Sequence, residues 1–145
     1  MRTEGFLTLA SVVKGVTWPA GEPLAAECLG PRLIPLPRLR PHGAPGARCE
    51  CGIYATDLGR ASQYLRDSIP FDLGRVLGRV ALWGTVVECE RGFRASYAYP
   101  VALYVPVGRG NGALRRALEL AAGLRRYRVP VELLLREQPD LAPAA

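Results

Sequence analysis

The stretch Gly78–Val105, which reads GRVALWGTVVECERGFRASYAYPVALYV, is the longest apolar run in the chain. It is rich in β-branched and aromatic residues, which suit a pleated and half-buried surface. The turn signal Glu90-Arg91-Gly92 divides it. The stretch therefore predicts a β-hairpin with strands over Val80–Cys89 and Phe93–Tyr99, and we expect the other segments to be organised around it.

The loop of this hairpin decides which residues face each other. A three-residue loop that ends in glycine fits a type I turn followed by a left-handed residue. A two-residue Arg91-Gly92 loop would scatter the apolar side chains over both faces, which disfavours it. The longer loop predicts four facing pairs on one side and an ion pair on the other: Cys89 with Phe93, Val87 with Ala95, Thr85 with Tyr97, Trp83 with Tyr99, and Glu88 with Arg94.

Two further features of the hairpin can be predicted. Gly84 lies in the middle of a strand, where a bend or a close approach of another backbone is usual. Trp83, Tyr97 and Tyr99 share one face in this register, which favours a place in the core. The alternative is an exposed aromatic platform that binds a ligand.

The rest of the chain predicts two helices and several short strands. Asp57 is a candidate N-cap of a helix over about 57–66, and Asn111 of a second helix over about 112–126. Strands are expected at four further places, the last of them at a sheet edge because it contains Pro130: residues 6–13, 16–18, 52–55 and 127–135.

These elements together predict the fold class. We expect residues 1–137 to form a single α+β domain, with a curved, barrel-like antiparallel sheet and two packed helices. Residues 138–145 are expected to be a frayed tail. The long segment Gly30–Arg48 holds five prolines and three glycines in nineteen residues, so it predicts a loop. A loop of this length is uncommon unless it is functional, disordered or tied down, and we expect it to fold over one end of the sheet.

Four residues in or beside this loop could tie it down: Cys28, His42, Cys49 and Cys51. Three thiolates and one imidazole are a known tetrahedral zinc set, and zinc would supply folding energy to a segment without ladder hydrogen bonds. The spacing is looser than that of a double C-x₂-C motif. Cys89 belongs to the apolar face of the hairpin, which excludes it from this set.

Three alternatives to a metal site remain open for these residues. The cysteines could be free buried thiols, or Cys28 could form a disulfide with Cys49 or Cys51. A thiolate at Cys49 or Cys51 could also act as a nucleophile beside Arg48, with His42 as its base.

The net charge of +6 is unevenly distributed along the chain. Residues 109–128 carry six arginines against Glu119 alone, and such patches attract anions, including nucleic acid. A solvated basic face is the simpler interpretation. Lys14 is the only lysine, a composition that indicates coding bias or thermal adaptation. The candidate ligand-binding residues are therefore Trp83, Tyr97, Tyr99, Arg109, Arg115 and Arg116.

Several short motifs resemble an uncharacterised family of small bacterial proteins. The motifs are Cys49-Glu50-Cys51-Gly52-Ile53-Tyr54-Ala55, then Leu82-Trp83-Gly84-Thr85-Val86-Val87-Glu88, then Gly92-Phe93-Arg94-Ala95 with Ala98-Tyr99-Pro100, which match CxCGIYA, LWGxVVE and GxRAxxAYP. The resemblance covers about residues 18–105. It implies one integral domain and the same cysteine and histidine types, and it implies no activity.

The sequence thus predicts a non-catalytic binding module with a structural zinc site and with nucleic acid as the first ligand to test. The alternatives are a small-molecule enzyme with a site at the Cys/His loop, and a protein-interaction or scaffold domain. No apolar run reaches the length of a membrane span, and no signal-peptide pattern is present, so we expect a cytoplasmic protein.

Overall fold

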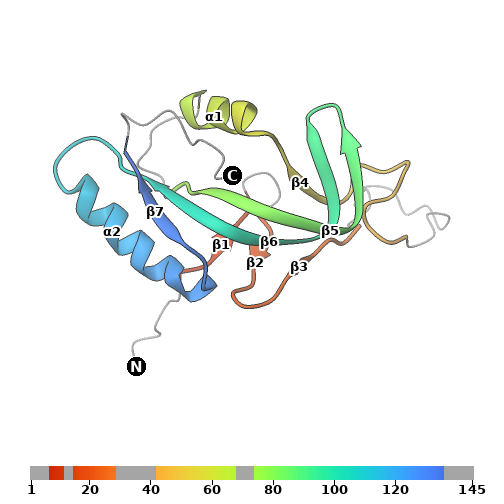
Figure 1. Cartoon of the computed structure of the whole chain (residues 1–145), viewed down its shortest axis with the longest axis horizontal. Coiled ribbons are helices and arrows are strands. Elements are labelled where there is room, and N and C mark those ends of the chain that lie inside the picture. The colour runs from red at the N-terminus through yellow and green to blue at the C-terminus, as the bar shows by residue number, and fades with distance from the viewer. Residues whose placement is uncertain (1–6, 12–14, 29–41, 68–73, 136–145) are drawn as a thin grey trace.

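The structure is a computed structural model that describes residues 7–11, 15–28, 42–67 and 74–135 (Figure 1). Its largest feature is the predicted hairpin, formed by β5 (Leu77–Cys89) and β6 (Gly92–Pro106). Both strands are longer than expected. β6 continues past Pro100 because Val101 forms a β-bulge there, and a bulge accommodates a residue that has no N–H to donate.

β6 is the central strand of a five-stranded sheet. β5 pairs along one side of it, and three short strands share the other side, namely β4 (Ile53–Ala55), β3 (Leu24–Ala25) and β7 (Val131–Leu134). The combination of this sheet with helices confirms the predicted α+β class. β7 runs parallel to β6, however, so the sheet is mixed instead of wholly antiparallel. No closed barrel forms within the described part of the chain, and the barrel-like shape is not confirmed.

β3 and β4 lie end to end along β6. β3 ends opposite Tyr97, the N–H of Ala26 donates to the carbonyl of Ser96 at 2.7 Å, and β4 begins opposite Ala95. The two strands therefore behave as one edge strand that is interrupted between Ala26 and Ile53. The proline-rich loop lies within this interruption, and its residues 29–41 are outside the described ranges, as is the tail 138–145.

The predicted register of the hairpin tip is wrong. The loop contains only Glu90 and Arg91, so Cys89 pairs with Gly92, Glu88 with Phe93 and Val87 with Arg94. The reason lies in β4: Gly92 has a φ of 136°, and a Cβ there would collide with the backbone of Ala55. This glycine is required by the close approach of a neighbouring strand and is not part of the turn.

A bulge at Gly84 changes the register once more. Gly84 (φ 78°) and Thr85 together lie opposite Ser96, whose hydroxyl accepts a hydrogen bond from the N–H of Thr85 at 3.1 Å. The hairpin turns sharply between its base and its tip, as Figure 1 shows. Trp83 then pairs directly with Tyr97, and not with Tyr99, so the expectation that Trp83 and Tyr97 share a face is confirmed by a different register.

The main core lies between the C-terminal half of β6 and α2 (Ala113–Leu124). The buried residues there are Leu103, Val105, Ala117, Leu124 and Tyr127. The hydroxyl of Tyr127, at the end of the 3₁₀ turn η1 (Arg125–Tyr127), accepts from the N–H of Leu9 at 2.8 Å and donates to the carbonyl of Trp18 at 2.7 Å. It thus fastens the small ribbon of β1 (Leu9–Ala10) and β2 (Thr17–Trp18) to this core.

The two predicted helices are present, with one capping residue correct and one wrong. Asp57 caps α1 (Leu58–Asp67) by accepting from the N–H of Arg60 at 3.0 Å. Gly112, and not Asn111, is the N-cap of α2, with a left-handed φ of 79°. α2 packs on the sheet, whereas most side chains of α1 lie outside the described set, so the packing of α1 stays a prediction.

The role of Gly92 can be tested by substitution. Gly92→Ala is expected to lower the free energy of unfolding by roughly 2 kcal/mol or more, because a Cβ there meets both a disfavoured φ and the backbone of β4. Gly110→Ala is the matched control, because Gly110 also has a positive φ but open space around it. Equal losses in urea unfolding of the two variants would contradict a specific contact with β4.

Candidate metal centre

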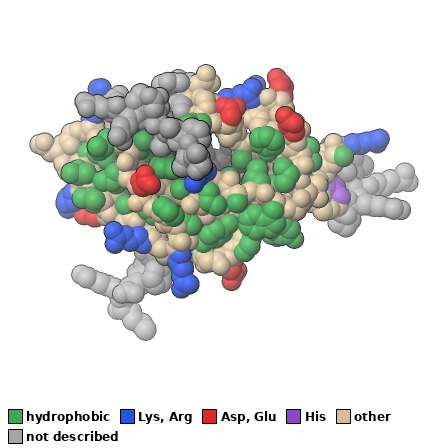
Figure 2. All heavy atoms as spheres, in the orientation of Figure 1, with side chains coloured by type: hydrophobic (Ala, Val, Ile, Leu, Met, Phe, Trp, Pro, Cys, Tyr) green, Lys and Arg blue, Asp and Glu red, His purple; other side chains and the backbone are tan. Residues whose placement is uncertain are grey.

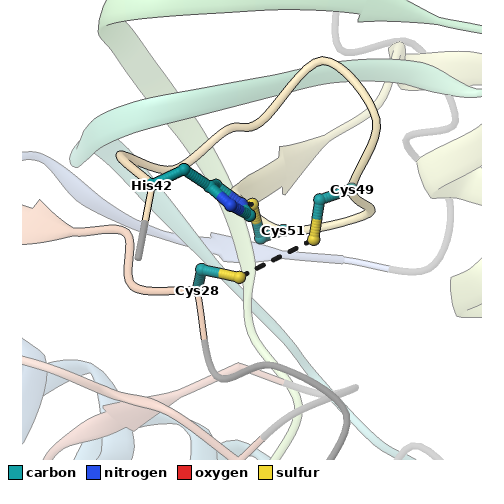
Figure 3. A group of neighbouring side chains, drawn as sticks. All are labelled: Cys28, His42, Cys49 and Cys51. Carbon is teal, nitrogen blue, oxygen red and sulfur yellow. Dashed lines mark hydrogen bonds between the residues drawn. The ribbon is translucent and has the colours of Figure 1, made fainter. Parts of the chain in front are cut away.

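The structure brings together all four residues that the sequence predicted as metal ligands (Figure 3). Cys28 follows β3, Cys49 and Cys51 precede β4, and His42 comes from the loop between them. One ligand atom from each residue lies within 4.8 Å of the others. The cluster therefore lies where the edge strand is interrupted, at the base of the proline-rich loop, and it could hold a metal ion.

Two distances within the cluster are close to those of tetrahedral coordination. The sulfurs of Cys28 and Cys49 are 3.7 Å apart, and Nε2 of His42 is 3.3 Å from the sulfur of Cys51. Zinc bonds of about 2.3 Å to sulfur and about 2.05 Å to nitrogen, at tetrahedral angles, would separate two sulfurs by about 3.8 Å and a sulfur from a nitrogen by about 3.6 Å. All four cysteines of the chain are free, so no disulfide occupies the site.

The backbone of the loop is shaped to fit the histidine and the buried sulfur. The N–H of Gly46 donates to Sγ of Cys51 at 3.1 Å, and its carbonyl accepts from the N–H of Cys49 at 3.2 Å. A Cβ on Gly46 would lie 2.6 Å from Nε2 of His42, so a larger residue would displace the imidazole. Cys51 is only 4% exposed, whereas His42 is exposed, so the site lies at the surface with one buried ligand.

Arg94 of β6 anchors the Cys49–Cys51 segment to the sheet, and sequence reasoning missed this role. Its guanidinium donates to the carbonyl of Cys49, and to that of Cys51 at 3.0 Å. The side chain is 9% exposed. The predicted ion pair of Arg94 with Glu88 is wrong because the shorter hairpin loop places Val87 opposite Arg94. The only signal in the sequence was a lone charge inside an apolar strand.

The surroundings of Cys49 favour its thiolate. In the metal-free protein, a hydrogen bond from the backbone of Cys51, followed by hydrogen bonds with the thiols of Cys28 and Cys51, lowers the pKa of Cys49 from its ordinary value near 9 to about 7. Metal ligands must be deprotonated to bind, so this shift reduces the cost of losing a proton on metal binding.

The predicted aromatic platform forms only in part. Trp83 and Tyr97 are exposed, at 39% and 42%, and their rings stack with centroids 6.1 Å apart, so their expected place in the core is wrong. Val86 and Phe93, on the same face by register, are also exposed. Tyr99 is half-buried, and its hydroxyl accepts from the N–H of Gly21 and donates to the carbonyl of Tyr127, both at 2.9 Å. Tyr99 therefore supports the fold.

The predicted arginines lie apart from the aromatic pair. Arg109, Arg115 and Arg116 are exposed at and before the start of α2, which lies at one end of the molecule, with the β5–β6 turn toward the other (Figure 1). Arg115 forms an exposed ion pair with Glu119 at 3.5 Å. Figure 2 shows hydrophobic side chains gathered over the middle of the sheet, with basic side chains mostly around them.

Comparison with protein-family models, with curated proteins and with solved structures found no match. The resemblance to the CxCGIYA family therefore stays a prediction. None of the helices in the described part of the chain is long and apolar enough to cross a membrane. The site has to be interpreted from its own geometry.

Metal analysis tests the cluster directly. Protein purified without chelator is expected to contain one zinc per chain, and Cys51→Ser to lose most of it, whereas Cys89→Ser keeps it because Cys89 lies outside the cluster. If chelation of the zinc lowers the free energy of unfolding by as little as about 3 kcal/mol, the melting temperature falls by roughly 10 °C. Wild-type protein with four freely titrating thiols and no stoichiometric metal would rule the site out.

The shifted pKa predicts a pH dependence. In metal-free protein, the alkylation rate of Cys49 is expected to rise with a midpoint near pH 7, about two units below an ordinary thiol, as measured by mass spectrometry of the peptides. Because the folded pKa lies below the unfolded one, the thiolate stabilises the metal-free fold fully above pH 9, and this contribution is lost as the pH falls through 7. A midpoint near pH 9 would contradict the shift, and added zinc should protect Cys49.

Proposed function

We propose that the protein is a non-catalytic binding module with a structural zinc site, and that its ligand is single-stranded nucleic acid. The observation that supports the zinc site is the set of four donor atoms within 4.8 Å of one another. A structural zinc site has four protein ligands, whereas a catalytic one keeps a position for water or substrate. Four protein donors close enough to share one ion favour the structural role.

Zinc would act here by closing a loop. Cys28 and Cys51 are the ligands nearest to β3 and β4, so a metal between them joins the two pieces of the interrupted edge strand. A two-residue and a three-residue strand contribute few ladder hydrogen bonds on their own. Zinc binding free energy would thus contribute directly to holding this side of β6.

The stacked pair of Trp83 and Tyr97 supports nucleic acid as the ligand. Exposed aromatic side chains stack on unpaired bases, which every sequence offers, whereas the bases of a duplex are already stacked. The exposed arginines before and along α2 add attraction for phosphates. These arginines and the aromatic pair lie apart. A single-stranded nucleic acid that contacts both must therefore be long enough to span the β-sheet.

A protein partner is the second candidate. Val86 and Phe93 extend the exposed aromatic face with side chains that are 46% and 42% exposed. Apolar area of this kind also suits a protein surface.

The small-molecule enzyme is the weaker alternative, because all four donors are engaged with one another and only one histidine exists to act as a base. We place the protein in the cytoplasm, where free thiols persist.

Binding can be measured by fluorescence anisotropy with labelled oligonucleotides of increasing length. Trp83→Ala and Tyr97→Ala are each expected to weaken binding about tenfold, since stacking of one base contributes about 1–3 kcal/mol. Val101→Ala is the control, because Val101 is as exposed as Trp83 but lies at the other bulge. Binding should weaken steeply with salt.

Two results would contradict the nucleic-acid proposal. The first is no binding of RNA or DNA by the zinc-loaded protein at low salt. The second is binding that the two aromatic substitutions leave unchanged. In the first case, recovery of a specific protein partner that Phe93→Ala releases would favour the interaction domain.

A further inference from the structure

Arg94 is a buried cation that forms no ion pair with a carboxylate in the described part of the chain. Arg94 is 9% exposed, and among the described residues its guanidinium donates to two backbone carbonyls, those of Cys49 and Cys51. The ion pairs formed within the described ranges join Arg60 to Asp57 and Arg115 to Glu119, and neither includes Arg94. Burying a charge costs several kcal/mol unless an opposite charge or a dense set of hydrogen bonds compensates.

A loaded metal site would provide the missing negative charge. Three thiolates and a neutral imidazole around Zn²⁺ carry a net charge of −1, whereas the empty site carries less negative charge at neutral pH, where the Cys49 thiol is still partly protonated. The carbonyls that Arg94 binds belong to two of the proposed ligands, so the charge of the site would lie next to the guanidinium. Arg94 and Cys51 are both buried, so an attraction between the guanidinium and this part of the site is stronger than in water.

From this arrangement we infer that Arg94 is the electrostatic partner of the metal site: its charge favours the metal-loaded, thiolate form over the empty one. The inference rests on the proposed zinc site and not on the nucleic-acid ligand. Arg94 is not one of the four proposed ligands, so it is a positioning residue. Partners of metal ligands in this position typically change metal affinity by about 10–100-fold.

The role of the charge can be separated from that of the hydrogen bonds by two substitutions. Arg94→Gln keeps N–H donors but removes the charge, whereas Arg94→Lys keeps the charge but cannot reproduce the planar fork. Zinc affinity is measured by competition with a chromophoric chelator. Arg94→Gln is expected to weaken zinc binding about tenfold or more, and Arg94→Lys clearly less.

Two controls make this comparison specific. Arg79→Gln removes an equal charge from an exposed position of β5 and should leave zinc affinity unchanged, which excludes an effect of net charge alone. Cobalt substitution reports the ligand set: wild type and Arg94→Lys should give the same tetrahedral thiolate absorption. A merely structural role of Arg94 would lower the stability of the empty and loaded protein equally and would leave zinc affinity unchanged.

Every outcome decides the inference. Equal affinity losses in Arg94→Gln and Arg94→Lys, or none in either, overturn it. If Arg94→Gln does not fold without metal, the zinc concentration for half refolding, followed by circular dichroism, replaces the competition assay. Refolding of both variants at the same zinc concentration then overturns it. A wild type without zinc removes both the metal site and this inference, whereas wild-type zinc binding with equal affinity of the two variants removes the inference alone.

Discussion

The backbone pairing of β6 is the interaction on which the rest of the structure depends. β5 supplies one side of it as a continuous hairpin strand, but three strands of two to four residues from distant parts of the chain supply the other. Strands this short are marginal alone. Each therefore needs its own attachment: α2 packs against β7 and the end of β6, and the Cys/His cluster joins the adjacent ends of β3 and β4.

The sequence was most informative where a pattern is local. The hairpin, the two helices and the Asp57 cap follow from periodicity and turn chemistry over a few residues. The register did not, because Gly92 is explained by β4, a strand that lies far away in sequence. The error at the loop and the bulge at Gly84 each shift the pairing by one residue in the same direction. Together they shift it by two residues, so Trp83 pairs with Tyr97 instead of Tyr99 and the two still share a face.

The same distinction explains which site residues could be predicted. Cysteine and histidine have few uses in or beside a proline-rich loop, so residue type and position in the sequence identified the four candidate ligands. Arginine and tyrosine have many uses, and their partners are decided by tertiary contacts. Arg94 was assigned to a cross-strand ion pair but holds the Cys49–Cys51 backbone, and Tyr99 was assigned to a ligand but connects Gly21 with Tyr127.

The two proposed sites meet on one strand. Along β6, Phe93 and Tyr97 point to the exposed aromatic face, whereas Arg94 between them points to the other face and binds the carbonyls beside the metal cluster. β4 begins two residues after the proposed ligand Cys51 and pairs with residues 93–95. Whatever stabilises the cluster therefore also holds the strand that carries the aromatic face, so the proposed metal site and the proposed ligand-binding face would depend on one strand without sharing a residue.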